Sequence, residues 1–321
     1  IVAFFLYYLT YGGVVLGLST VIYGTQCREV QLLVNKIAAL EGMDASCICA
    51  SDDVDGSYRF MYGKDYDSDE KLKDANMAKM FSNGDDIEKA LQATNSLVLI
   101  GYDTPIQKDY LEALMGATSS STLSQLVLVS KMGVTKGGGG GFFGGGGNAK
   151  VLESEERIRQ LAQTKDLDLS IIRAGILKGG GPGDKSNGYG LNKVYYNTIL
   201  DLLEFTMTTG HDTFTLGIQG GDDNKDDNNN GSAITPGDNI QMPNKIQQMA
   251  TQSSFEPRPY DTNRIVLASS IVATLLLSDQ NKKNGQEEGD MAPLRQEFSV
   301  STARGEQLPT KEEWFATLSQ L

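Results

Sequence analysis

Cysteine, histidine and basic residues are scarce in this chain of 321 residues. The three cysteines, Cys27, Cys47 and Cys49, are odd in number and lack metal-ligand spacing, and His211 is the only histidine. The sequence therefore argues against a disulfide scaffold and against a metal site. The 28 lysines and arginines are outnumbered by 41 acidic residues, which gives a net charge of −13. Because phosphate binding needs clustered basic side chains, we expect no nucleic-acid partner.

Charge is also missing from the N-terminal segment, which reads IVAFFLYYLTYGGVVLGLSTVIYG and has no charged residue before Arg28. An uncharged apolar run of this length meets the requirement of ~20 residues for a transmembrane helix. We predict that residues 1–17 form a membrane anchor and that residues 18–23 form the first strand of a folded domain. The alternative is a buried strand followed by a buried helix. Because the chain opens without a Met or a basic region, we expect further targeting or anchor residues before Ile1.

From residue 18 onward, short apolar segments alternate with helical patterns. The length and the composition, 40% hydrophobic and 21% charged, allow one large α/β core. Apolar residues from Val30 to Leu40 recur at helical spacing, and Asp85 is the expected N-cap of a second helix. We expect strands at 45–51, 77–82, 97–101, 125–130, 169–173 and 297–301, helices at 28–40, 86–92, 108–115, 192–207, 263–279 and 310–321, and a long amphipathic helix between residue 149 and the strand at 169–173. This alternation predicts a doubly wound parallel sheet over residues 18–321.

Three segments lack any such periodicity. Residues 137–147 read GGGGGFFGGGG, and ordering so many glycines costs enough backbone entropy that we expect a mobile flap. Residues 220–231, GGDDNKDDNNNG, are acidic and polar and predict a solvated loop. The acidic stretch at 52–76 is predicted to be a loop as well. The apolar helix at 263–279 is bounded by charges and is too short for a second membrane span.

The ordered set of these elements resembles the NmrA-like atypical short-chain dehydrogenase/reductase family from residue 18 to the C-terminus. Three segments carry the resemblance: VIYGTQCREVQLLVNKI, QLVLVSKMG and NAKVLESEERIRQLAQTKDLDLSIIRAGIL. The family begins with a strand and a glycine-rich GATGxxG turn that leads into the first helix. The resemblance implies a Rossmann-like domain that binds NAD(P)(H).

The resemblance also implies where the cofactor would lie. Gly24, Thr25 and Gln26 stand at the start of the glycine-rich turn, and Gly101 ends the predicted strand at 97–101. The later glycines of the turn are replaced by Cys27 and Val30, and Glu29 adds a negative charge near the expected phosphates. NAD(P)(H) binding is therefore either retained in altered form or lost.

Asp52 follows the second strand, where a carboxylate accepts hydrogen bonds from the adenine ribose and favours NAD over NADP. The alternative is that Asp52 is a polar strand end beside two further aspartates.

The catalytic residues implied by the family are incomplete. Active members use Tyr-x-x-x-Lys, in which the lysine lowers the pKa of the tyrosine that transfers the proton. Lys150 stands in the place of that lysine, but Gly146 replaces the tyrosine, and Ser130 matches the family's serine. Ser130 and Lys150 are then catalytic remnants, and we expect no catalysis.

Two functions are consistent with these features. The first is a noncatalytic accessory subunit or assembly factor of a large membrane protein complex. By family precedent this would be a thylakoid photosystem supercomplex in a plastid, with a respiratory complex of the mitochondrial inner membrane as second choice. The anchor would also contact membrane lipid. The alternative is a membrane-tethered NAD(P)H-dependent reductase that acts on a lipid, a quinone or a pigment.

Overall fold

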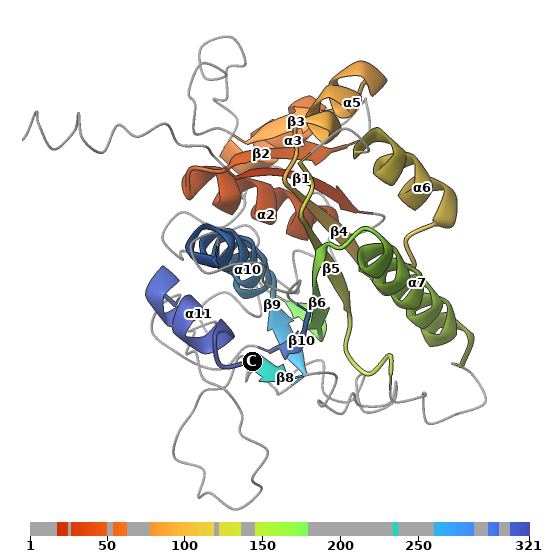
Figure 1. Cartoon of the computed structure of the whole chain (residues 1–321), viewed down its shortest axis with the longest axis vertical. Coiled ribbons are helices and arrows are strands. Elements are labelled where there is room, and N and C mark those ends of the chain that lie inside the picture. The colour runs from red at the N-terminus through yellow and green to blue at the C-terminus, as the bar shows by residue number, and fades with distance from the viewer. Residues whose placement is uncertain are drawn as a thin grey trace, which may run out of the picture.

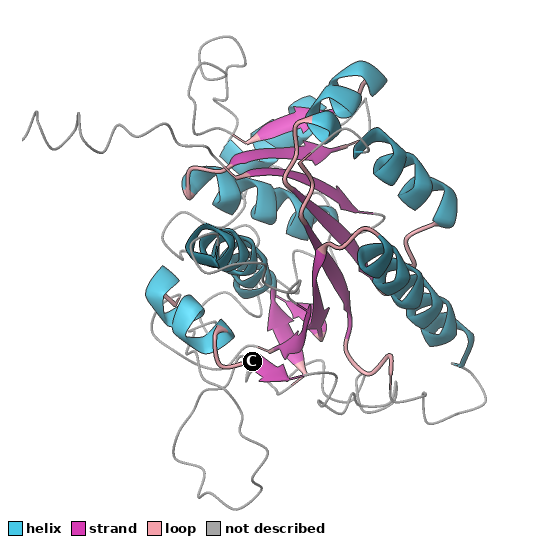
Figure 2. Ribbon diagram, in the orientation of Figure 1, coloured by secondary structure: helices cyan, strands magenta, loops and turns pink. Residues whose placement is uncertain are grey.

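A computed structural model shows a parallel β-sheet covered by helices on both faces (Figures 1 and 2). The residues that it describes are 18–24, 27–49, 54–62, 78–118, 122–135, 145–178, 234–236, 260–285, 295–301 and 309–321. The predicted anchor at 1–17, the predicted helix at 192–207 and the predicted loop at 220–231 lie outside these residues, and so does most of the glycine-rich insert. Within the described residues, no helix combines the length and the apolarity that a membrane span requires.

The main sheet has eight strands, of which seven run parallel. Their order across the sheet is β3 (Lys79–Phe81), β2 (Asp44–Ile48), β1 (Ser19–Gly24), β4 (Ser96–Tyr102), β5 (Gln125–Lys131), β6 (Asp168–Ala174), β10 (Arg295–Val300) and β8 (Ile234–Pro236). Only β8 is antiparallel to its neighbour in this sheet. A separate parallel pair joins β7 (Ile176–Lys178) to β9 (Asp261–Asn263).

The strand order reverses between β1 and β4, because the chain builds β2 and β3 on one side of β1 and then returns to the other side. This is the topological switch point of a doubly wound Rossmann-type sheet. The predicted doubly wound parallel sheet is therefore confirmed.

Helices form one layer on each face of the sheet (Figure 2). The first layer contains α2 (Arg28–Leu40), α3 (Val54–Tyr62), α10 (Arg264–Gly285) and α11 (Lys311–Leu318). The second contains α5 (Gly84–Gln92), α6 (Lys108–Ala117) and α7 (Gly145–Thr164). Each layer packs its own apolar cluster against the sheet, so the central strands are buried on both faces and read as continuous apolar runs.

Three local predictions were wrong. Residues 54–62 of the expected acidic loop form α3, because Tyr58 and Met61 face the core one turn apart. The N-cap of α5 is Asn83, whose side chain accepts a hydrogen bond from the backbone N–H of Asp86 at 2.9 Å, while Asp85 lies inside the first turn. The last three glycines of the expected flap, residues 145–147, belong to the first turn of α7.

Candidate functional site

The carboxyl ends of β1, β4, β5 and β6 meet at one edge of the sheet, and α2 begins there with Cys27 as its N-cap. We call this the carboxyl edge. In open α/β sheets, ligands bind outside the carboxyl ends of the strands at the switch point, and a dinucleotide places its pyrophosphate on the N-terminus of the first helix. The carboxyl edge is therefore where the fold implies NAD(P)(H).

Glycines at this edge were expected to leave room for the cofactor. A Cβ at Gly24 would lie 2.1 Å from Nε2 of Gln31, and a Cβ at Gly101 would lie 2.8 Å from the carbonyl oxygen of Thr104. At Gly175, which follows β6, it would lie 1.9 Å from the carbonyl oxygen of Tyr260. The chain's own atoms occupy the space where each Cβ would project, so the packing requires glycine at these three positions. Thr25, Gln26 and Asp52, the other predicted cofactor contacts, lie outside the described residues.

Cys27 adopts a left-handed backbone conformation of the kind that glycine favours in a glycine-rich turn. Its φ of 59° and ψ of 50° are left-handed, a conformation that glycine adopts without steric cost. Its thiol makes no capping hydrogen bond to α2. Burial raises the pKa of Cys27 to about 12, Arg264 opposes this rise, and Asp103 and Glu29 add to it. The thiol therefore stays neutral and is no nucleophile at physiological pH.

Tyr102 is the second left-handed residue at this edge, with a φ of 53°. Its phenol donates a hydrogen bond of 2.6 Å to the carbonyl oxygen of Gly175. Burial raises the pKa of Tyr102, Cys27 and Asp103 raise it further, and Arg264 partly offsets the rise. The phenol therefore stays protonated at neutral pH and keeps its hydrogen bond to Gly175.

Ser130, the predicted catalytic remnant, lies near the end of β5 and is buried. Its hydroxyl donates a short hydrogen bond to Oε1 of Glu155 on α7. Lys150 lies on the same helix with an exposed side chain, and Gly146 lies in its first turn. The structure therefore pairs Ser130 with a carboxylate that sequence reasoning did not single out.

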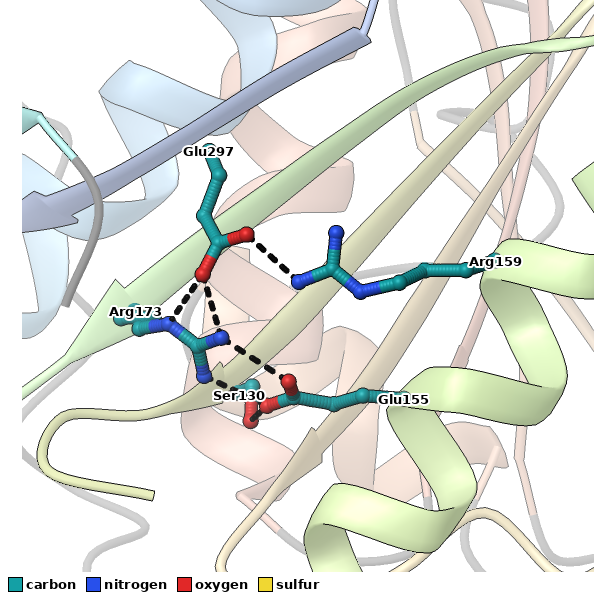
Figure 3. A network of polar contacts seen from close by, with 5 residues as sticks. All are labelled: Ser130, Glu155, Arg159, Arg173 and Glu297. Carbon is teal, nitrogen blue, oxygen red and sulfur yellow. Dashed lines mark hydrogen bonds and ion pairs between the residues drawn. The ribbon is translucent and has the colours of Figure 1, made fainter. Parts of the chain in front are cut away.

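Glu155 belongs to a buried ion network that joins α7, β6 and β10 (Figure 3). Arg173 on β6 donates to both oxygens of Glu155, at 2.6 and 2.9 Å, and its Nε and Nη2 donate to Glu297 on β10, at 3.0 and 2.5 Å. Arg159 on α7 completes the network with a contact of 2.5 Å to the other oxygen of Glu297. Figure 3 shows the guanidinium of Arg173 between the two carboxylates.

Two arginines balance two glutamates in this network, so its formal charge is zero. Burial alone disfavours the charged form of Arg173, but hydrogen bonds and charge from Glu155 and Glu297 leave its pKa raised. Burial likewise pushes up the pKa of Glu297, yet the hydrogen bonds from Arg159 and Arg173 outweigh it and leave the pKa lowered. Arg173 and Glu297 therefore stay charged near neutral pH, and the hydroxyl of Ser130 donates its hydrogen bond to Glu155 within this network.

Sequence reasoning missed the network and Tyr102. One signal was present, because Arg173 interrupts the apolar strand LSIIRAG and a buried arginine requires a partner. The described residues contain no group of three or more His, Cys, Asp or Glu side chains that could hold a metal ion.

No family model matches the sequence, and no curated protein matches it. Solved structures with a similar arrangement include UDP-glucose 4-epimerase from Brucella ovis in complex with NAD, at 12% identity and a TM-score of 0.41 over 94% of this chain and 82% of that one. Vestitone reductase from alfalfa (Medicago sativa) is 10% identical, with a TM-score of 0.44 over 92% of this chain and 85% of that one. UDP-N-acetylglucosamine 4-epimerase from Bacillus cereus is also 10% identical, with a TM-score of 0.41 over 94% and 84%.

Similarities of this size carry no inference about the ligand or activity of this chain. Its class rests on its own strand order and switch point, which define a doubly wound Rossmann-type α/β protein.

Proposed function

We propose that this chain is a noncatalytic accessory subunit or assembly factor of a large membrane protein complex. The observation that carries the noncatalytic part is the hydrogen bond from Ser130 to Glu155. A serine that polarises a substrate carbonyl must offer its proton to the substrate, whereas here a buried, ion-paired carboxylate accepts it. Gly146 supplies no phenol, and Lys150 has no tyrosine one turn before it.

The membrane part of the proposal is supported by the uncharged segment at 1–17, which directly precedes β1. An anchor there would raise the effective concentration of the domain near its partner to roughly millimolar for a short linker. An interface of ~1,000 Å² would then suffice. On the family resemblance, we favour a photosystem supercomplex of the thylakoid membrane, followed by a respiratory complex of the mitochondrial inner membrane.

Co-migration tests the partner. The full chain, solubilised from its membrane in mild detergent, should migrate with a large complex on a native gel, and a version that begins at residue 18 should associate much more weakly. Migration only as a free monomer, under conditions that keep known complexes whole, would contradict the proposal. Carbonate washing at high pH tests the anchor separately, since an integral protein stays in the membrane.

Turnover assays test the noncatalytic part. We expect no NAD(P)H-dependent reduction of lipid, quinone or pigment carbonyls by the purified chain. If turnover is found and disappears in Lys150→Ala, the chain is instead the membrane-tethered reductase.

A further inference from the structure

We infer that Tyr102 occupies the place of a dinucleotide at the carboxyl edge, so that the folded protein does not hold NAD(P)(H) there, and that removing its ring creates a dinucleotide site. The inference deepens the proposed function, on whose noncatalytic part it rests, by naming the residue that closes the site. One observation carries it: the span of the Tyr102 side chain, whose hydrogen bond to Gly175 closes the carboxyl edge between β4 and β6.

The side chain of Tyr102 reaches across the end of a whole strand. Tyr102 ends β4, its hydrogen-bond acceptor Gly175 follows β6, and β5 lies between these two strands. Neighbouring strands are about 4.8 Å apart, so the contact bridges roughly 10 Å along the carboxyl edge. A dinucleotide bound at the switch point extends along this same edge. The ring and its hydrogen bond therefore lie where the ligand would lie.

The N-terminus of α2 is crowded and already carries acidic groups. Beyond the effect of burial, Cys27 and Asp103 raise the pKa of Tyr102 and Arg264 lowers it, so these three residues lie around the ring. Glu29 stands in the first turn of α2, where its negative charge complements the helix dipole that would otherwise attract a phosphate. The positive charge of Arg264 lies beside these two carboxylates, so charge alone does not exclude a diphosphate, and the ring of Tyr102 is the obstacle that the variants test.

The left-handed backbone at residue 102 determines which substitutions can remove the ring without strain. A φ of 53° is costly for tyrosine and natural for glycine, and asparagine adopts it more readily than most residues. Tyr102→Gly therefore removes the ring and relieves the backbone at once. Tyr102→Phe keeps the ring and removes only the hydrogen bond to Gly175. The two variants separate occupation of the space from the hydrogen bond.

Binding is measured on the full chain in mild detergent by titrating NADH and, separately, NADPH, with nucleotide fluorescence as the readout. We expect no saturable binding by the wild-type chain or by Tyr102→Phe up to roughly millimolar nucleotide. Tyr102→Gly should bind saturably, with a dissociation constant at least about tenfold below that concentration. Tyr110→Ala is the matched control, because Tyr110 is an exposed tyrosine on α6, and it should match the wild type. If Tyr102→Gly does not fold, as judged by its thermal transition, Tyr102→Asn takes its place.

Saturable micromolar binding of either nucleotide by the wild-type chain overturns the inference, and so does a folded Tyr102→Gly or Tyr102→Asn that binds no better than wild type. These results are distinguishable from failure of the proposed function. Nucleotide binding by the wild-type chain without turnover contradicts only the inference about Tyr102. Turnover contradicts both this inference and the noncatalytic part of the proposed function.

Discussion

Arg173 is fully buried in a parallel strand, and its charge is tolerated because carboxylates reach it from two other elements. Taking an isolated charge out of water costs several kcal/mol, and only paired, hydrogen-bonded partners offset this. Glu155 supplies a bidentate contact from α7, and Glu297 supplies a second from β10. The network therefore fixes the position of β10 beside β6 and of α7 over both strands.

At the residue scale, breaking this network should cost much more than breaking an exposed pair. Arg173→Met leaves Glu155 buried without a counter-charge, and we expect a loss of about 3–5 kcal/mol in the free energy of unfolding. Adding Glu155→Gln should recover part of that loss, because the uncompensated charge is gone. Urea unfolding followed by circular dichroism measures both variants.

The control is Arg157→Met on the same helix, which removes an exposed contact of 3.0 Å to Glu153 and should cost about 0.5 kcal/mol or less. Similar losses for Arg157→Met and Arg173→Met, or strictly additive losses for Arg173→Met and Glu155→Gln, would show that the network does not act as a unit.

The lowered pKa of Glu297 predicts a pH dependence with a defined sign. A carboxyl whose folded-state pKa lies below its unfolded-state pKa contributes stability above the unfolded value and loses it as the pH falls through the folded value. The unfolding free energy of the wild-type chain should therefore decline as the pH falls below about 4.5. Glu297→Gln should show a shallower decline in urea titrations at each pH. Glu153→Gln, which removes an exposed carboxylate, should follow the wild type, and equal slopes for all three proteins would refute the assignment.

At the element scale, the cap of α5 distinguishes two neighbouring polar residues. Asn83 accepts the backbone N–H of Asp86, whereas Asp85 lies within the helix. Asn83→Ala should lower the free energy of unfolding by about 1 kcal/mol, because one N-terminal N–H group loses its partner. Asp85→Ala removes only a charge near the positive end of the dipole and should cost about 0.3–0.5 kcal/mol. The reverse order in chemical denaturation would restore Asp85 as the cap.

Long and strongly patterned elements could be predicted from the sequence, whereas most of the three-residue strands could not, the exception being β3 within the predicted strand at 77–82. The strands β4 and β5 are buried on both faces and so appear as LVLIG and QLVLVS, and the period of α2 is visible from Val30 onward. By contrast, β7, β8 and β9 have three residues each, which is too few for a period to show. Leu40 fits the apolar period of α2 yet is 53% exposed at the last position of the helix.

The site was predictable only as far as its positions along the chain. Ser130 at the end of a strand followed from the sequence, but the network around it did not, since Ser130 and Glu155 lie 25 positions apart and Arg173 and Glu297 lie 124 positions apart. Tyr102 directly follows the predicted Gly101, yet no pattern in the sequence indicates that its ring crosses to Gly175. Such contacts depend on strand order and on the direction of side chains, which only the assembled sheet defines.

At the scale of the whole molecule, C-terminal elements complete the fold begun by the N-terminal half. The helix α10 packs against α2, and β10 pairs with β6. Away from the carboxyl edge, Asp168 at the start of β6 accepts a hydrogen bond from Ser278 and pairs with Lys282, at 2.7 and 2.9 Å. Late and early segments are thus joined at both ends of the sheet, which favours unfolding as one unit.

The fluorescence of the only tryptophan tests whether the domain unfolds as one unit. Trp314 lies on α11, is 3% exposed, and belongs to the apolar cluster that α2 and α10 share. Its fluorescence follows the C-terminal helix, whereas far-ultraviolet circular dichroism follows all helices and strands. If the domain is a single cooperative unit, both signals should give the same urea midpoint and the same slope. A lower midpoint for the fluorescence would mean that α11 detaches before the sheet unfolds.

Trp314→Phe, which keeps an aromatic ring in the cluster, should shift the circular dichroism midpoint only slightly. Trp314→Ala should lower the free energy of unfolding by about 3–5 kcal/mol, because it leaves a cavity between the three helices.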